Sequence, residues 1–332
     1  EKFKKMTNIL IALVLILLIA TLVQVLRVSE LLSELKKQDV NEVTDKDNAI
    51  QGRLLLIVGT LFLGSVVWQF VNWIPLMLPP ASSVHGAVID SLMQFTMLLI
   101  IFVFFITQPL LFWYGYKYNK NKKNPVAFFY PHNNKLEIIW TVVPTIVLTA
   151  VILYGLSAWD KITNADTTDS QIIELYAKQF DWTARYAGDD NTLGYSNYRL
   201  VKGPNQLGVD LTDELAQDDV VVKEVHLVVD KPVLLKMRSR DVIHSAFLPH
   251  FRVQMNCVPG MITQFAFTPT QTTAEMKIQE GEDFEFVLLC NKICGAAHYN
   301  MQMKFVVETQ EEYDAWMASQ KTVENTLTLK TK

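Results

Sequence analysis

The sequence predicts a helical membrane anchor followed by an all-β domain in water, and three observations support this fold class. Half of the 332 residues are hydrophobic. Residues 1–158 carry 13 basic and 9 acidic side chains, a net charge of +4, whereas residues 159–332 carry 17 and 25, a net charge of −8. Long stretches without any charged residue lie only in the first half. This division excludes a disordered chain, a collagen-like repeat and a disulfide-rich miniprotein. The acidic second half also argues against binding to nucleic acid.

Four charge-free stretches are each long enough to cross a bilayer, since about 20 helical residues span a hydrocarbon core of about 30 Å. They contain 20, 21, 26 and 22 residues and cover 7–26, 54–74, 91–116 and 138–159. The first stretch also resembles a signal peptide, because Lys2, Lys4 and Lys5 precede it. Its apolar run is longer than a usual signal core and no small-residue cleavage site follows, so we expect a fourth membrane span.

The charges of the connecting loops predict the orientation of the anchor. Loops 27–53 and 117–135 contain five Lys or Arg residues each, whereas loop 75–90 contains none. Because basic loops stay in the cytoplasm, the second half of the chain is expected on the opposite side of the membrane. This orientation places the N-terminus outside despite its lysines, and removal of an upstream signal would explain that position.

From about residue 160 onward the pattern is typical of β-structure. Val233, Leu235 and Met237 alternate with Lys236 and Arg238, which is the period of a half-buried strand. Turn-forming clusters separate several short segments rich in Val, Ile and Phe. We predict an antiparallel β-sandwich or barrel, followed by a helix near 310–321 and a polar tail. The expected strands cover 172–176, 220–229, 233–237, 284–289 and 303–307.

One short stretch after the predicted strand 284–289 combines residues that bind metals. Cys290, Cys294, His298 and Met301 follow the pattern C-x3-C-x3-H-x2-M. Thiolate and thioether ligands favour copper, and zinc sites rarely use Met. A disulfide between Cys290 and Cys294 is the alternative interpretation, because the expected compartment permits one. His244, 46 residues upstream, supplies a further candidate ligand.

These motifs together resemble the cytochrome c oxidase subunit II family. The resemblance rests on the sequence DVIHS at 241–245, VPG at 258–260, the cysteine loop, and HNNKLEIIWT at 132–141, and it extends over about 91–316. It implies a two-helix anchor joined to a cupredoxin-like Greek-key barrel. The expected organisation is an extra N-terminal region with two transmembrane helices (1–89), a two-helix subunit II anchor (90–159), a copper domain (160–309), and a C-terminal helix and tail (310–332).

The resemblance also implies a binuclear copper centre, called CuA. Two thiolates would bridge two copper ions, each ion would have one imidazole, and a thioether and a backbone carbonyl would complete the set. By position in the family motif, these ligands are His244, Cys290, Lys292 (backbone carbonyl), Cys294, His298 and Met301. Haem of the a type and a further copper, CuB, would belong to the partner subunit I.

Two departures from the family pattern concern a magnesium ion. The family usually has an acidic residue at the position of Lys292, and often has Asp at the position of Asn256. That acidic side chain helps to hold magnesium at the boundary with subunit I. An ammonium group cannot ligate a dication, so magnesium binding is doubtful in this chain.

The resemblance suggests roles for three further residues. The family accepts electrons through an aromatic segment that matches 179–182, with Phe180 where many relatives have Trp. Both Phe180 and Trp182 are therefore candidates for the surface that receives electrons. Glu137 matches a carboxylate near the mouth of a proton channel of subunit I, although a charged residue at the start of a span is equally typical of an interfacial anchor.

The implied function is to accept electrons from a cytochrome c and pass them to haem in subunit I, where oxygen reduction drives proton pumping. The alternatives are the copper-bearing subunit of another haem–copper reductase and a quinol oxidase subunit II without copper. The complete set of side-chain ligands disfavours the copper-less alternative. The expected partners are subunits I and III, a cytochrome c, and the lipids of a bacterial inner membrane, with the copper domain on the periplasmic side.

The two spans beyond the family's usual pair, 7–26 and 54–74, suggest how the donor is held. The sequence contains no C-x-x-C-H motif for attaching haem. The acidic domain is able to steer a basic soluble cytochrome. We instead expect the extra spans to dock the oxidase against a neighbouring membrane complex, so that the donor cytochrome is held within a supercomplex.

Overall fold

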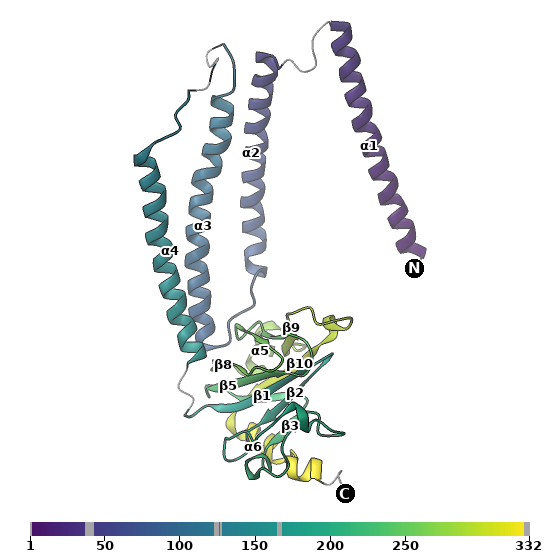
Figure 1. The fold of residues 1–332 in the computed structure, drawn as a ribbon, viewed down its shortest axis with the longest axis vertical. Coiled ribbons are helices and arrows are strands. Elements are labelled where there is room, and N and C mark those ends of the chain that lie inside the picture. The colour runs from purple at the N-terminus through teal and green to yellow at the C-terminus, as the bar shows by residue number, and fades with distance from the viewer. Residues whose placement is uncertain (1, 37–42, 123–125, 127, 165–167, 329–332) are drawn as a thin grey trace. The chain divides into compact units, whose positions relative to one another are not determined.

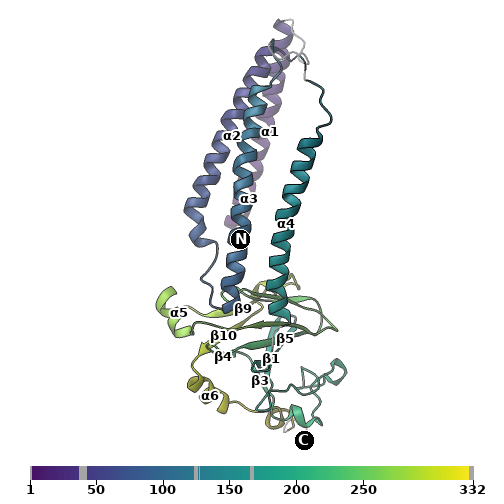
Figure 2. The ribbon, with the colours of Figure 1, turned by 90° about the vertical axis from the view of Figure 1, so that its left-hand side faces the viewer.

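The computed structural model describes residues 2–36, 43–122, 126, 128–164 and 168–328. Four long helices come first, and a β-rich domain follows (Figures 1 and 2). Each helix has a window with a mean hydropathy between 2.2 and 2.7, and is long and apolar enough to cross a membrane. This arrangement confirms the predicted fold class. The helices are α1 (Lys2–Lys36), α2 (Asp45–Trp73), α3 (Val84–Lys117) and α4 (Asn134–Thr163).

The chain divides into two compact units, and the first comprises residues 1–72 and 102–133. Within this unit α2 packs closely against the second half of α3. A Cβ at Gly59 would lie 2.3 Å from the ring of Phe112, so only glycine fits there. The ring of Phe62 meets that of Phe112 edge-on at 6.4 Å. Small residues at such contacts allow membrane helices to approach each other without a hydrophobic driving force.

The second unit comprises residues 73–101 and 134–332 and contains the β-domain. Two five-stranded sheets form this domain. In spatial order, the first sheet contains β3 (Val220–Val222), β2 (Asp181–Tyr186), β1 (Gln171–Lys178), β5 (Val233–Ser239) and β8 (Thr263–Phe267). The second sheet contains β4 (Val225–Val228), β10 (Gln302–Glu308), β9 (Phe286–Cys290), β6 (His244–Leu248) and β7 (Val253–Cys257). Two short helices accompany them, α5 (Thr273–Glu280) and α6 (Gln310–Ala318).

The core of the domain follows the alternation seen in the sequence. Val233, Leu235 and Met237 of β5 are fully buried, whereas Lys236 and Arg238 are partly exposed. Large aromatic side chains fill the space between the sheets. Those with almost no exposed surface are Trp182, Phe251, Phe286 and Phe305.

The prediction of a purely antiparallel domain is wrong. β1 pairs with β5 in parallel, and β10 pairs with β4 in parallel. The single strand expected over 220–229 is also divided, with β3 in one sheet and β4 in the other. The break falls at Lys223, whose Nζ donates hydrogen bonds to Trp182 O at 3.1 Å and Thr183 Oγ1 at 2.8 Å. Side-chain alternation reports burial and carries no information on strand direction.

An ion pair joins the β-domain to the first anchor helix of this unit. The guanidinium of Arg252 contacts both carboxylate oxygens of Asp90 in α3, at 2.7 and 2.9 Å, and donates to Pro79 O at 2.7 Å. Ser83 Oγ donates to Phe251 O at 2.7 Å beside it. Two parallel bonds between a guanidinium and a carboxylate fix geometry as well as contribute energy. The pair therefore ties the first turns of α3 to the domain.

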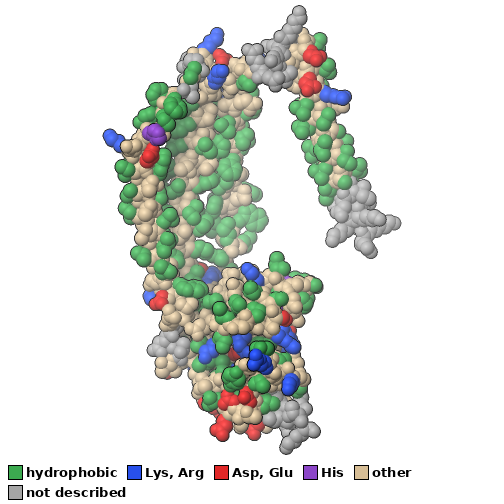
Figure 3. Space-filling model, viewed as in Figure 1, with side chains coloured by type: hydrophobic (Ala, Val, Ile, Leu, Met, Phe, Trp, Pro, Cys, Tyr) green, Lys and Arg blue, Asp and Glu red, His purple; other side chains and the backbone are tan. Residues whose placement is uncertain are grey.

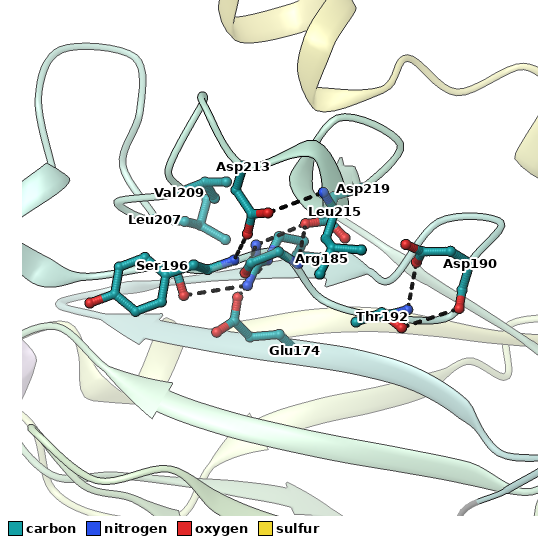
Figure 4. A network of polar contacts seen from close by, with 12 residues as sticks. Glu174, Arg185, Asp190, Thr192, Ser196, Leu207, Val209, Asp213, Leu215 and Asp219 are labelled. Carbon is teal, nitrogen blue, oxygen red and sulfur yellow. Dashed lines mark hydrogen bonds and ion pairs between the residues drawn. The ribbon is translucent and has the colours of Figure 1, made fainter.

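A buried network of ion pairs lies on the outer face of the first sheet (Figure 4). Arg185 is 1% exposed and binds Glu174 Oε2 at 2.8 Å and Asp219 Oδ2 at 2.9 Å. Arg238 also pairs with Glu174. Although burial acts to raise it, the pKa of Glu174 is held below its ordinary value by these two guanidiniums. Burial raises the pKa of Asp219 to about 7 against the opposing effect of Arg185.

We expect Arg185→Leu to destabilise the β-domain strongly, because it leaves the carboxylates of Glu174 and Asp219 buried with fewer partners. Loss of one partner of a buried ion pair costs about 3–5 kcal/mol of unfolding free energy. Urea unfolding followed by tryptophan fluorescence measures this loss. The control is Arg199→Leu, which replaces an exposed arginine and should change stability by less than about 0.5 kcal/mol. Equal effects of the two substitutions would contradict the assigned role of Arg185.

Candidate metal centre

Strand pairing brings His244 to the cysteine loop. β6 begins at His244, and β9 ends at Cys290. The two strands are antiparallel neighbours, with Ala246 opposite Cys290. The start of one strand and the end of the other therefore meet at one edge of the sheet. A hydrogen bond from Asn291 N to Ser245 O, of 3.0 Å, continues the contact into the loop.

The ligand atoms predicted from sequence converge at this edge. His244 Nδ1 lies 3.7 Å from Cys290 Sγ, and the two sulfurs of Cys290 and Cys294 are 3.8 Å apart. Both cysteines are free thiols, so the alternative of a disulfide is not what the structure contains. The ligand atoms of these three residues all lie within 4.8 Å of one another. Within the described segments, no other group of three or more His, Cys, Asp or Glu residues brings its potential ligand atoms this close to one another.

The remaining candidates complete the cluster from the same loop. Cys294 Sγ lies 3.6 Å from His298 Nδ1 and 3.8 Å from Met301 Sδ. The carbonyl oxygen of Lys292 lies 3.3 Å from Cys290 Sγ. His298 begins a 3-10 turn, His298–Asn300, that returns the chain to β10. The structure thus gathers all six predicted ligand groups around one point.

The chemistry of these donors fits copper. Two thiols, two imidazoles, a thioether and a carbonyl form a soft set of ligands. His244 is 0% exposed, Met301 1%, and Cys294 5%, so these ligand groups are shielded from water, whereas His298 is partly exposed. Burial, aided by the neighbouring Cys290, raises the pKa of the Cys294 thiol to about 11. Because a metal binds the thiolate, loading of the site releases protons.

Asp241 orients one of the imidazoles, a role that we did not predict from the sequence. Its Oδ1 lies 2.8 Å from Nε2 of His244, leaving Nδ1 to face the sulfur of Cys290. Burial acts to raise the pKa of Asp241, but hydrogen bonds from Gln179 N and His244 hold it below its ordinary value. A carboxylate behind a ligating histidine fixes the tautomer and the ring orientation. The spacing of three residues between Asp241 and His244 was the available signal.

The turn between β1 and β2 covers the cysteine loop. Gln179 Nε2 donates a hydrogen bond of 2.5 Å to Cys294 O. The half-buried ring of Phe180 lies against Gly295, where a Cβ would come within 2.8 Å of the ring. Gly295 also has a φ of 141°, which side chains disfavour. Gly295 therefore allows both the path of the loop and the approach of Phe180.

The two aromatic candidates occupy different positions. Trp182 is 1% exposed, and its ring centroid lies 6.2 Å from that of His244. Its Nε1 donates to Met301 O at 3.4 Å. Phe180 is partly exposed. Of the two, Phe180 is the one that reaches the surface, while Trp182 packs behind the cluster.

The other residues singled out in the sequence supply no ligand atom to the cluster, although Cys257 lies opposite His244 in the pairing of β6 with β7. Glu137 is half-buried in the first turn of α4, at the opposite end of that helix from the β-domain. The Lys292 side chain and Asn256 are exposed and supply no carboxylate for magnesium. Cys257 is fully buried, and burial raises the pKa of its thiol to about 12. That thiol is an inert packing group.

Comparisons with known proteins identify the family of the chain. Residues 71–158 match the family model described as cytochrome c oxidase subunit II, transmembrane domain, and residues 171–310 match the periplasmic domain of the same subunit. The alternative cytochrome c oxidase subunit 2 of Bradyrhizobium diazoefficiens is 32% identical over 274 residues, which cover 80% of this chain and 91% of the relative. Cytochrome c oxidase subunit 2 of Cereibacter sphaeroides is 27% identical, with coverage of 81% and 84%.

A solved structure is similar over the β-domain. The crystal structure of the periplasmic domain of subunit II of cytochrome oxidase from Bradyrhizobium japonicum has 23% sequence identity and a TM-score of 0.32, and it covers 46% of this chain and 94% of that one. The two matched segments of the family models together take in the two-helix anchor and the β-domain. The chain belongs to the cytochrome c oxidase subunit II family and is a membrane-anchored subunit of a haem–copper oxidase, an oxidoreductase complex, with its β-domain outside the membrane.

Proposed function

We propose that this chain holds a binuclear copper centre, accepts electrons from a cytochrome c, and passes them to haem in subunit I. The observation that supports this proposal most strongly is the cluster of His244, Cys290 and Cys294 at one sheet edge. His298, Met301 and the Lys292 carbonyl supply the remaining ligands of CuA. A copper-less quinol oxidase subunit would have no use for this complete set of buried soft donors.

Bound at this site, two copper ions would supply a one-electron relay. Cys290 and Cys294 are placed to contact both ions, since their sulfurs are 3.8 Å apart. The ligands sit at the ends of paired strands, and Asp241 holds His244 in one orientation. Pre-organised ligands of this kind resist geometric change when the charge of the site changes. The surrounding core excludes water from the sulfurs.

Electrons would reach the site through the turn of β1 and β2. Phe180 is partly exposed and lies on Gly295, the residue after Cys294. Gln179 binds the carbonyl of Cys294 directly. A donor that docks on Phe180 is thus separated from the cysteine loop by a single side chain. Trp182, buried beside His244, would fix the geometry of the site from behind.

A second surface near the loop fits contact with subunit I. Ile293 and Tyr299 of the loop are each 87% exposed, and Ile262, after the VPG segment, is 64% exposed. Exposed apolar side chains that gather in one region are typical of interaction sites. We assign these three residues to the contact with subunit I.

Glu137, at the other end of α4, remains a proposed proton-uptake residue. Glu137→Gln should then lower the number of protons pumped per electron.

We further propose that the protein resides in a bacterial inner membrane with its β-domain in the periplasm. The helices α1 and α2 begin well before residue 71, where the family match starts. The hydrophobic side chains on the helices are visible in Figure 3. Spans outside the family match are available for docking a neighbouring respiratory complex that carries the donor cytochrome.

Purification in mild detergent tests the proposed supercomplex. We expect the oxidase to co-purify with a second respiratory complex that contains a cytochrome c, and to turn over without added donor. Recovery of an isolated oxidase, active only with added soluble cytochrome, would contradict the docking role of α1 and α2 without affecting the copper site.

Removal of one bridging thiol should abolish the copper centre. We expect Cys290→Ser to lose copper from this chain, because a hydroxyl does not replace a bridging thiolate. The measurement is the ratio of copper to haem in the purified oxidase. Cys257→Ala is the matched control, since that buried thiol lies next to the cluster, opposite His244, but is not among the ligand groups, and its removal should leave the ratio unchanged. Retention of full copper by Cys290→Ser would refute the assignment.

Truncation of Phe180 should separate electron uptake from copper binding. We expect Phe180→Ala to slow electron transfer from cytochrome c by about tenfold, the effect of truncating an aromatic anchor at the centre of an interface. The absorbance of the copper site should not change. Tyr195→Ala, which truncates an aromatic side chain 58% exposed elsewhere on the domain, is the control. If Trp182→Phe slows transfer and Phe180→Ala does not, electrons enter beside Trp182 instead.

A further inference from the structure

A cavity lies where the two anchor helices of the second unit meet the β-domain, away from the copper ligands. Its volume is about 430 Å³, within the range of ligand-binding pockets. The first turns of α3, the last turns of α4 and the strand β8 form its walls. Most of the lining is apolar, including Val88, Ile89, Ala158, Ile162 and Phe267.

The cavity lies at the outer boundary of the membrane spans. Its residues from α3 end at Ile89, just before the charge-free stretch 91–116 begins. Its residues from α4 begin at Ala158, where the charge-free stretch 138–159 ends. Because these stretches match the hydrocarbon core in length, the cavity is placed at the level of the lipid headgroups.

Two ionisable groups line the cavity: a lysine, which favours negative charge, and a neutral histidine, since burial lowers the pKa of His85 to about 4. Among the described residues that line it, Lys161 is the only charged one. His85 also lines the cavity, and its Nε2 is buried without a hydrogen-bond partner among the described residues. The His85 ring is held edge-on to Phe265, with centroids 5.2 Å apart. A buried polar nitrogen without a partner is costly, and a bound ligand would satisfy it.

We propose that this cavity binds an anionic phospholipid of the surrounding bilayer. The ammonium of Lys161 would contact the phosphate, and the imidazole of His85 would donate to a phosphate or ester oxygen. The apolar wall would accept the upper part of an acyl chain. A free phosphate ion would gain nothing from that wall, whereas a lipid uses both parts of the cavity. A basic residue near an anionic lipid surface favours binding of a negatively charged headgroup.

A bound lipid would support the junction that positions the copper domain. Ile89 in the wall is next to Asp90, which forms the ion pair with Arg252. Phe267 of β8 lies on the other side of the cavity and packs in the domain core against Phe251. Occupancy of the cavity would therefore tie α3 and α4 to the first sheet.

The test is retention of lipid by the full-length oxidase in mild detergent, measured by native mass spectrometry with phosphatidylglycerol and with phosphatidylcholine of the same chain length. We expect one tightly held phosphatidylglycerol at this site. Lys161→Gln should weaken its retention by about fivefold, the contribution of one basic residue near a lipid surface. Ala158→Trp should abolish retention by filling the cavity without changing its charge.

Lys135→Gln, at the other end of α4, is the matched control and should retain the lipid as wild type does. Unchanged copper absorbance in each variant shows that the domain is folded. The proposal is overturned if Ala158→Trp retains the lipid, if Lys161→Gln and Lys135→Gln behave alike, or if phosphatidylcholine is held as tightly as phosphatidylglycerol. None of these outcomes concerns the copper site, so the lipid proposal and the proposed function are tested independently.

Discussion

The antiparallel pairing of β6 with β9 is the constraint on which the rest of the site depends. It places Ala246 opposite Cys290 and so brings His244 within 3.7 Å of the first sulfur. A shift of one residue in this register would turn His244 to the other face of the sheet. The β1–β2 turn then closes over the loop through Gln179, whose amide binds the Cys294 carbonyl. The ligands are thus fixed by backbone pairing, with side-chain hydrogen bonds setting the orientation of the imidazole.

The ligand loop was predictable because its members are neighbours in the chain. Cys290 to Met301 span 12 residues, so any compact loop brings their side chains together. The difference in burial between Phe180 and Trp182 required the structure, because the period of β2 sends one side chain inward and the turn leaves the other at the surface. The function of Asp241 was missed for a similar reason. Its hydrogen bond to His244 depends on a turn just before β6 that hydrophobic periodicity does not describe. The strands β2, β6, β7 and β8 were also not named from the sequence, since polar side chains interrupt their hydrophobic pattern.

The anchor and the β-domain are connected by groups that the copper chemistry does not use. The bidentate pair of Arg252 and Asp90 fixes α3 to the domain. The cavity beside it presents the ammonium of Lys161 and the Nε2 of His85, which has no hydrogen-bond partner among the described residues. Electron transfer over a fixed distance needs a domain that does not move relative to the membrane. The buried charge network around Arg185 serves the same end inside the domain, where it holds the first sheet to the loops that cover it.

We propose that one sheet edge holds two copper ions that share an electron. The most direct measurement is the electron paramagnetic resonance spectrum of the oxidised protein. We predict the hyperfine pattern of one unpaired electron distributed equally over two copper nuclei, as expected when Cys290 and Cys294 bridge both ions. A pattern from a single copper nucleus, or no signal from this chain in copper-replete protein, would contradict the account.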